Sequence, residues 1–367
     1  MKFRFHCLGL PHTKTTRDFS HCAYTQKVWK FCKMMKDRGH YVIHYGAEGG
    51  DPPCDEDVAV VSDETWRSVY RSVEKQTSTF FGWSLDDAAY REFNRRAVDE
   101  INQRKQQGDF LLPFFGCGAR RVCDDVEGVI VVEPGIGYPD GHFAPYKVFE
   151  SYALLHAMWG ADKVRNCEPN WYDVVIPNYF DLDEFKPCYE KEDYLLYIGR
   201  VYAGKGVSIA LEVCKRLGVK LKVAGHLDNS FVEGYREQWE SCVEYCGPVL
   251  PQERNRLMSR ALGTFAPTWY VEPFGGVQVE SLLCGTPTIT SDWGAFTENN
   301  IHGVTGYRCR TLRDFCVAAE KLLNGSIDYR ECRKHGERFS LQNVAPMYEK
   351  FFRDVHDVEF GDGWYEL

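Results

Sequence analysis

Short apolar runs alternate with helical patterns along nearly the whole chain. In the first half, apolar runs that predict strands cover residues 3–8, 41–45, 58–61, 110–115, 129–132 and 174–176. Patterns that predict helices lie at residues 23–36, 86–107 and 146–159. Strands that alternate with helices in this way are typical of βαβ units, which build parallel sheets.

The second half shows the same alternation with greater regularity. Predicted strands cover residues 194–198, 221–224, 243–246, 264–266 and 288–290. Predicted helices cover residues 207–217, 231–241, 252–261, 277–284, 315–323 and 344–352. In the helix at 207–217, Ala210, Val213, Cys214 and Leu217 recur at the spacing of one buried helix face.

A segment rich in turn-forming residues, at 177–187, separates the two halves. We therefore expect an α/β fold with two doubly wound domains, one over residues 1–180 and one over residues 181–345. Residues 346–367 are too few for a domain and can pack back on the first half. In doubly wound sheets, ligands bind beyond the carboxyl ends of the strands, which places the expected site in a cleft between the halves.

The composition supports a folded chain and narrows its partners. Of 367 residues, 44% are hydrophobic and 14% aromatic, enough for sizeable cores and unlike a disordered chain. The formal net charge of -9 disfavours stable nucleic-acid binding, although a pocket with one or two cations can still hold a nucleotide diphosphate. No apolar run is long enough to span a membrane, and peripheral membrane contact remains open.

Fifteen cysteines raise the question of disulfides or a metal. Several lie in apolar runs, where a thiol behaves as a small core residue; these are Cys7, Cys22, Cys32, Cys214, Cys284 and Cys316. The closest pairs, Cys117/Cys123 and Cys242/Cys246, lack the spacing of a metal site. We expect no metal, and a reducing, cytoplasmic location.

Two cations follow the first predicted strand of the second half. Gly199 and Arg200 come directly after the strand, and Lys205 precedes the next helix at Gly206. A helix N-terminus attracts anions, so these cations are well placed to bind phosphate. The alternative is an ordinary turn with solvated charges.

A glycine loop framed by two carboxylates comes later in the same half. Glu272 precedes Phe274, Gly275 and Gly276, and Glu280 lies about one turn inside the following helix. Glycines let a backbone approach a ligand closely, and a carboxylate can accept hydrogen bonds from both hydroxyls of a ribose. For Glu280 the alternative is a charge that only complements the helix dipole.

These features together resemble a known family. Glu272 and Glu280 match the E-x7-E arrangement of retaining glycosyltransferases, and with Gly199-Arg200, Lys205-Gly206 and the Gly-Thr-Pro at 285–287 they resemble family 4 of the GT-B superfamily, "glycosyl transferases group 1". Residues 175–181 resemble the interdomain stretch of that family. Gly294 and Glu298 fit its downstream loop, but Ala295 stands where the family has a second glycine.

The resemblance implies a GT-B fold of two Rossmann-like domains and a retaining transfer from a nucleotide diphosphate sugar, without a metal or other cofactor. It implies that Arg200 and Lys205 contact the diphosphate, Glu272 the sugar and Glu280 the ribose. By the same resemblance, the backbone amides of residues 274–276 contact the sugar or a phosphate, and the departing phosphate accepts the proton of a hydroxyl acceptor. We expect that acceptor to be a glycan or glycoconjugate.

The first half offers fewer candidates. His12 and His21 lie in the segment after the first strand, and His142 follows a strongly apolar strand. Loops at such positions often carry binding groups, so these histidines are acceptor-side candidates, with His142 also a candidate for catalysis. Solvated loop positions are the alternative.

Other functions on the same fold stay open. They are a noncatalytic nucleotide- or glycan-binding protein, a sugar-nucleotide epimerase and a phosphorylase. A phosphorylase of this fold usually needs a lysine-bound pyridoxal cofactor, for which the sequence shows no motif. Neither the nucleotide base nor the sugar can be identified from the sequence.

Overall fold

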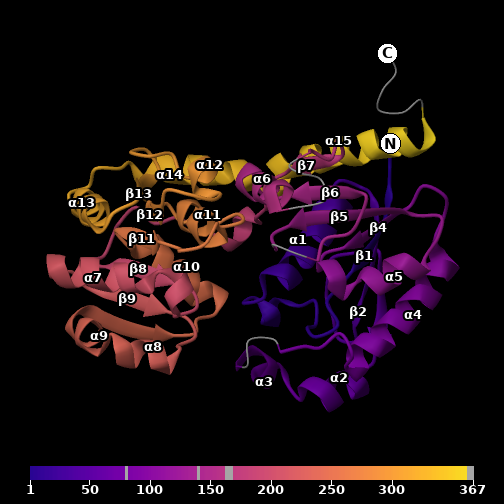
Figure 1. Ribbon diagram of the computed structural model, residues 1–367, viewed down its shortest axis with the longest axis horizontal. Coiled ribbons are helices and arrows are strands. Elements are labelled where there is room, and N and C mark those ends of the chain that lie inside the picture. The colour runs from indigo at the N-terminus through magenta and orange to yellow at the C-terminus, as the bar shows by residue number, and fades with distance from the viewer. Residues whose placement is uncertain (79–81, 139–140, 162–167, 362–367) are drawn as a thin grey trace. The chain divides into compact units, whose positions relative to one another are not determined.

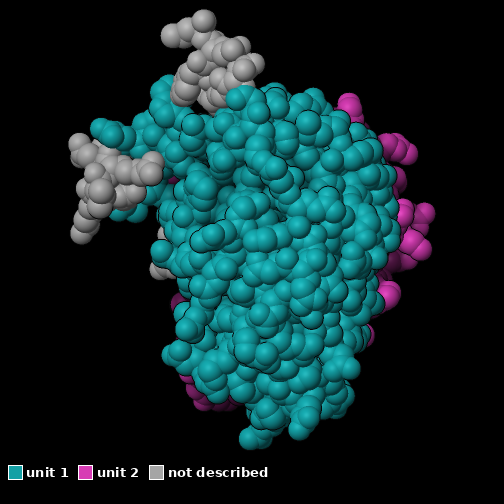
Figure 2. Space-filling model, turned by 90° about the vertical axis from the view of Figure 1, so that its right-hand side faces the viewer, with its two compact units in different colours: residues 1–150, 157–179, 341–367 teal, residues 151–156, 180–340 magenta. Residues whose placement is uncertain are grey.

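The computed structural model describes residues 1–78, 82–138, 141–161 and 168–361. It divides into two compact units (Figure 2). Unit 1 contains residues 1–150, 157–179 and 341–367, and unit 2 contains residues 151–156 and 180–340. Each unit is an α/β layer structure, with helices on its own sheet (Figure 1).

Unit 1 contains a parallel sheet of seven strands in the order β3-β2-β1-β4-β5-β6-β7. The strands are β1 (Arg4–Leu8), β2 (Tyr41–Ala47), β3 (Glu56–Val61), β4 (Phe110–Pro113), β5 (Ile130–Ile136), β6 (Tyr146–Phe149) and β7 (Asp173–Val175). The strand order reverses between β1 and β4, the type of position where doubly wound sheets bind ligands.

The helices of unit 1 include a C-terminal one that returns to its core. They are α1 (Ala23–Asp37), α2 (Asp63–Tyr70), α3 (Val73–Ser78), α4 (Ala88–Arg104), α5 (Arg120–Asp125), α6 (Tyr152–Ala161), which starts in unit 2, and α15 (Leu341–Phe360). The ring of Phe352 on α15 lies 4.7 Å from that of Phe5 and 4.8 Å from that of Phe110. Helix α15 thereby completes the aromatic core of unit 1.

Unit 2 contains a parallel sheet of six strands in the order β10-β9-β8-β11-β12-β13. The strands are β8 (Leu195–Ile198), β9 (Leu221–Ala224), β10 (Val243–Gly247), β11 (Gly263–Ala266), β12 (Thr288–Ser291) and β13 (Gly306–Cys309). The helices are α7 (Val207–Leu217), α8 (Asn229–Gly234), α9 (Arg236–Cys242), α10 (Pro251–Arg260), α11 (Gly276–Leu283), α12 (Phe296–Asn299), α13 (Leu312–Leu323) and α14 (Tyr329–Gly336). Its strand order reverses between β8 and β11.

Alternate residues of β8 enter different cores of unit 2. Leu195 and Tyr197 pack with residues of α7 and α13, whereas Leu196 and Ile198 pack with residues of α10 and α11. Successive side chains of a strand point to opposite faces, so both faces of this sheet are covered. This explains why its strands read as continuous apolar runs.

The doubly wound α/β fold is confirmed, and two predicted elements are wrong in part. Residues 146–149, predicted as the start of a helix, form strand β6 between β5 and β7, and the helix begins only at Tyr152. Aromatic and β-branched side chains favour this strand, whose Tyr146, Val148 and Phe149 are buried. The helix predicted at 231–241 is interrupted at Tyr235 and forms α8 and α9.

Within the described residues, no helix is both long and apolar enough to cross a membrane.

The described residues also form short 3-10 turns between the helices and strands. They are η1 (Arg17–Phe19), η2 (Gly116–Gly118), η3 (Leu182–Glu184), η4 (Ala203–Lys205) and η5 (Glu337–Phe339).

Candidate functional site

The switch point of the unit 2 sheet carries the cations predicted from the sequence. Gly199 and Arg200 directly follow β8, and Lys205 ends the turn η4 that leads into α7. Gly206 adopts a φ of +68°, and a Cβ there would lie only 1.8 Å from the carbonyl oxygen of Pro267. A glycine is therefore required where the turn after β8 meets the segment after β11.

Two tyrosines accompany the two cations. The Arg200 guanidinium lies 5.0 Å from the ring centre of Tyr202, and the Lys205 ammonium lies 4.9 Å from that of Tyr270. The Tyr197 hydroxyl donates a hydrogen bond of 2.7 Å to the Arg200 carbonyl, which ties down the backbone at the end of β8. Cation–π contacts of this kind stabilise a positive charge above the face of an aromatic ring.

Lys205 and Glu272 form an ion pair, with the Lys205 Nζ 3.3 Å from the Glu272 Oε2. These residues are 67 positions apart in sequence and follow β8 and β11, the two strands that flank the switch point. The pair thus joins one predicted phosphate-binding residue with the predicted sugar-binding residue.

The loop after β12 fixes the backbone around Glu272. Trp293 Nε1 donates to the Tyr270 carbonyl at 3.1 Å, and the Ala295 amide donates to the Glu272 carbonyl at 2.9 Å. Gly294 has a φ of +63°, and a Cβ there would lie 2.5 Å from the Glu272 nitrogen. The first glycine of the family's pair is therefore required, while the alanine at the second position is buried and bonded through its backbone.

The turn at residues 274–276 is anchored by an aromatic ring. Phe274 is buried, with its ring 6.1 Å from Phe180 and 5.6 Å from Phe339. Gly275 has a φ of +84° and caps the N-terminus of α11, which begins at Gly276. The Phe274 side chain thus belongs to the core, and only the backbone of this turn remains to contact a ligand.

Glu280 has a different partner from Glu272. Its Oε1 lies 3.5 Å from Nη1 of Arg254 on α10, and both side chains are largely buried. Sequence reasoning did not single out Arg254 or Tyr270. For Arg254, the sequence signal was a cation on the helix after β10. For Tyr270, it was an aromatic residue two positions before Glu272.

His12, an acceptor-side candidate in unit 1, is buried rather than solvated. Its Nδ1 lies 2.9 Å from the Tyr90 hydroxyl, and its ring lies within 6 Å of those of Trp83 and Phe115. Burial lowers the pKa of His12 to about 3, so the imidazole is neutral at physiological pH. A neutral imidazole can exchange hydrogen bonds but supplies no positive charge.

The other two candidate histidines of unit 1 are half-buried. His21 precedes α1, and the ring of His142 lies 6.1 Å from that of Phe149. The backbone next to His142 is held by Glu133, whose carboxylate accepts hydrogen bonds from Phe143 N at 2.8 Å and Ala144 N at 2.9 Å. Burial raises the pKa of Glu133. The roles of His12, His21 and His142 stay predictions.

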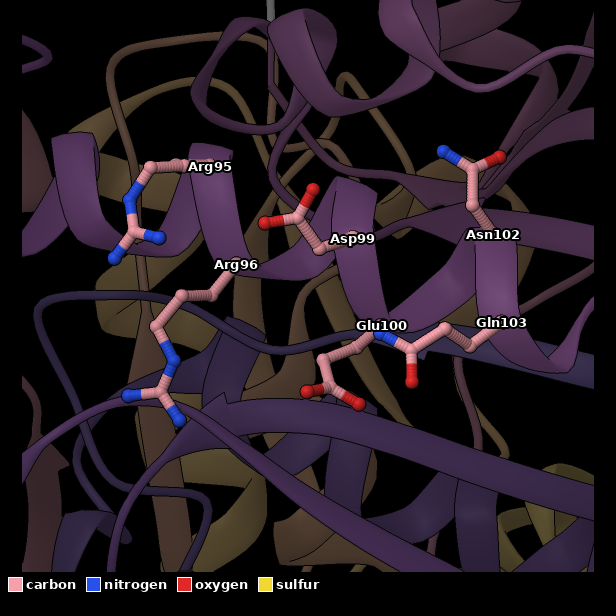
Figure 3. Close-up of a pocket in the computed structure, with 6 residues that line it drawn as sticks. All are labelled: Arg95, Arg96, Asp99, Glu100, Asn102 and Gln103. Atoms are coloured by element: carbon pink, nitrogen blue, oxygen red, sulfur yellow. The ribbon is translucent and has the colours of Figure 1, made fainter.

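A surface depression of about 420 Å³ lies on α4. Its lining is Arg95, Arg96, Asp99, Glu100, Asn102 and Gln103, and all six side chains come from that one helix (Figure 3). Arg96 pairs with Glu92 at 3.0 Å, and Arg104 pairs with Glu100. The opposite charges compensate one another, as expected for a solvated helix face.

Among the residues described, no group of three or more His, Cys, Asp or Glu side chains is arranged to hold a metal ion.

Part of the chain is similar to a known enzyme family and to several curated proteins. Residues 192–325, which contain the Lys205–Glu272 pair and Glu280, match the family described as "Glycosyl transferases group 1". The glycogen synthase of Mycobacterium tuberculosis (strain H37Rv) is 33% identical over 173 residues, which are 41% of this chain and 40% of that protein. The D-inositol 3-phosphate glycosyltransferase of Mycobacterium marinum is 25% identical over 226 residues, 54% of this chain and 48% of that protein. The chain spans half or less of the length of these curated relatives.

Solved structures match nearly the whole chain. AviGT4, a glycosyltransferase involved in avilamycin A biosynthesis, has a TM-score of 0.71 at 17% identity and covers 96% of this chain and 98% of its own. Anabaena Alr3699/HepE in complex with UDP and glucose has a TM-score of 0.69 at 13% identity and covers 96% and 100%. The fold is therefore the GT-B fold, and residues 192–325 are similar to the glycosyl transferases group 1 family.

Proposed function

We propose that this protein is a retaining, metal-independent glycosyltransferase. It transfers a sugar from a nucleotide diphosphate sugar to a hydroxyl of a glycan or glycoconjugate. The observation that carries the proposal is the Lys205–Glu272 ion pair at the switch point of the unit 2 sheet. The pair joins a cation that can bind phosphate to a carboxylate that can bind sugar hydroxyls, at the switch point where doubly wound folds bind ligands.

The chemistry of glycosyl transfer gives a role to each of the four charged residues predicted from the sequence in this part of unit 2. When the bond from the sugar to the diphosphate breaks, negative charge grows on the leaving phosphate. Arg200 and Lys205 stabilise that charge, and such stabilisation accelerates the reaction because it is stronger in the transition state than in the substrate. Glu272 binds hydroxyls of the sugar, Glu280 binds the ribose, and the leaving phosphate accepts the proton of the acceptor.

The relatives support this function. The curated proteins are a glycogen synthase and an inositol phosphate glycosyltransferase, and a structural neighbour is described with UDP and glucose. UDP-glucose is therefore the first donor to test. The cysteines that the structure describes are all free thiols, in keeping with the reducing cytoplasm that we propose as its location.

The donor can be identified by thermal-shift measurements and sugar-release assays with UDP-, GDP- and ADP-sugars. We expect selective stabilisation by one nucleotide sugar and slow release of its sugar. Stabilisation without any release or transfer would indicate a noncatalytic binding protein, and inversion at the sugar carbon adjacent to C1 would indicate an epimerase. No stabilisation by any of them would contradict the proposal.

Substitutions at the ion pair test the site. Glu272→Ala and Lys205→Ala should each lower the transfer rate by about a hundredfold or more, since each removes a charge that acts on the reacting groups. Lys215→Ala is a matched control, because Lys215 is a cation on α7 that pairs with Glu237 at 2.6 Å. Wild-type rates in both site variants, with a folded protein, would rule out these assignments.

A further inference from the structure

Trp83 is a large aromatic side chain that stays exposed at the carboxyl end of the unit 1 sheet. Its exposed fraction is 43%. Its ring centre lies 5.9 Å from that of His12, which follows β1, and 5.3 Å from that of Phe115, which follows β4. Strands β1 and β4 flank the switch point of this sheet, where doubly wound folds bind ligands. Trp83 is therefore an exposed aromatic group at a ligand-binding position of unit 1.

The described aromatic neighbours of Trp83 lie on one side of its indole. The ring centres of Trp83, His12 and Tyr90 are 5.9, 5.7 and 6.0 Å apart, and their planes are inclined by at most 31°. Those of Trp83, His12 and Phe115 form a similar triangle, with sides of 5.9, 5.3 and 5.2 Å. Rings on opposite sides of the indole would be separated by the sum of their distances to it. The exposed area of Trp83 is therefore on its other side.

The segment that carries Trp83 is held by hydrogen bonds before and after it. The Gln76 side chain donates to the carbonyl of the residue before Trp83 at 3.0 Å and to that of His12 at 2.9 Å. The Asp87 carboxylate accepts from the Ser84 amide at 3.3 Å, and the Asp87 amide donates to the Ser84 carbonyl at 3.1 Å. A side chain that is already ordered loses little conformational entropy when a ligand stacks on it.

The groups around Trp83 favour an uncharged ligand with one apolar face. Burial lowers the pKa of His12, so its ring is neutral at pH 7 and supplies no positive charge to the indole. The Asp87 carboxylate, fixed beside this segment, disfavours a phosphate or another anion. A pyranose ring has C–H groups on one face and hydroxyls at its rim. It can therefore place its apolar face on the indole and keep its hydroxyls in water.

We propose that Trp83 is a specificity-determining residue that binds an uncharged pyranose ring of the acceptor glycan by stacking. This inference rests on the proposed function, which requires a hydroxyl acceptor. His12, Tyr90 and Phe115 support the indole from its other side and need not touch the acceptor.

Fluorine NMR of the full chain labelled with 5-fluorotryptophan tests this proposal. The variant Trp83→Phe identifies the signal of Trp83 among those of the nine tryptophans. The probes are maltotriose, cellotriose and mannotriose, with adenosine as a flat ring of different chemistry. We expect at least one trisaccharide to shift the Trp83 signal saturably, and adenosine to bind more weakly than that trisaccharide.

Affinities of variants separate stacking from a structural role. Trp83→Ala should bind the same trisaccharide about tenfold more weakly, as expected for the loss of one ring contact. Trp83→Phe keeps an aromatic face and should retain most of the affinity. Trp171→Ala is the matched control, because Trp171 is a still more exposed tryptophan of unit 1, at 68%. If Trp83→Ala does not fold, the signal shift in the wild type decides.

The outcomes distinguish this inference from the proposed function. Absence of a saturable Trp83 shift with every trisaccharide, or equal affinity of W83A and wild type, would overturn the stacking role and leave sugar release from the donor unaffected. Adenosine binding as tightly as the trisaccharides would also overturn it, because the surface would then suit a heteroaromatic base. Trisaccharide binding at Trp83 without binding of any nucleotide sugar would support stacking and contradict the proposed transfer.

Discussion

His12 is a residue whose protonation is changed by burial in the fold. Burial lowers its pKa to about 3, compared with about 6.5 for an exposed histidine. Between these two values the unfolded chain binds a proton that the folded chain does not. The free energy of unfolding therefore falls as the pH falls from 6.5 towards 3, by about 1.4 kcal/mol per pH unit from this residue alone.

The pH dependence of unfolding by urea measures this contribution. We expect His12→Gln to be less stable than wild type at pH 7 but to lose less stability on going to pH 5. Carboxylates and other histidines contribute equally to both proteins, so the difference in slope reports His12. An unchanged slope in H12Q would show that His12 is not held neutral.

Gly294 allows a second prediction at the scale of one residue. A Cβ at this position would meet the Glu272 nitrogen at 2.5 Å in a backbone with a φ of +63°. We expect Gly294→Ala to cost at least about 2 kcal/mol of unfolding free energy, and to weaken binding of a nucleotide sugar because Glu272 must shift. Gly303→Ala is the control, because Gly303 has a φ of +80° with open space around its Cβ and should lose only about 1 kcal/mol.

At the scale of elements, Glu298 shows how a loop residue stabilises a helix. Its carboxylate accepts hydrogen bonds from the Tyr152 amide at 3.0 Å and the Ala153 amide at 2.8 Å, at the N-terminus of α6. From the sequence, Glu298 was assigned only to a segment that resembles the downstream loop of the glycosyltransferase family. The structure adds a specific partner, the positive end of a helix dipole.

We therefore expect Glu298→Gln to lower the free energy of unfolding by about 1 kcal/mol, because the charge and one of two equivalent acceptors are lost. Raising the salt concentration should reduce the difference from wild type, since Glu298 is exposed and its charge is screened. Urea unfolding at low and high salt measures both effects. Glu320→Gln on α13 should show no such loss, and equal stability of E298Q and wild type would mean that water replaces the carboxylate.

The alternation of apolar and polar residues was sufficient to predict most elements, because strands covered on both faces read as short apolar runs. Helix α7 is found at the predicted residues, since its apolar face has helical spacing and Gly218 ends it. Strand β6 was missed because residues 146–149 run into an equally apolar helix, and an apolar pattern alone does not separate the two. Only the pairing of β6 with β5 and β7 decides its conformation.

For the molecule as a whole, the sequence was sufficient to predict residues of the candidate site, but not the side chains that these residues contact. Lys205 and Glu272 were predicted to serve one ligand, and the fold places them in contact at the switch point. Arg254 and Tyr270 were not predicted, because their contacts with Glu280 and Lys205 come from the approach of distant segments and not from sequence spacing. The burial of His12 likewise depends on Trp83 and Tyr90, which lie far away in the sequence, Tyr90 by 78 positions.

The proposed reaction makes a final prediction for the whole protein in its dependence on metal ions. Because Arg200 and Lys205 are assigned to the leaving diphosphate, we expect transfer to continue at an unchanged rate after dialysis against EDTA. Added Mn²⁺ or Mg²⁺ should alter that rate by less than about twofold. In Lys205→Ala, added Mn²⁺ should restore part of the lost rate if the lysine acts through its charge on the phosphate. Loss of wild-type activity in EDTA, with recovery on adding Mn²⁺, would show that a metal ion and not this pair of cations stabilises the leaving group.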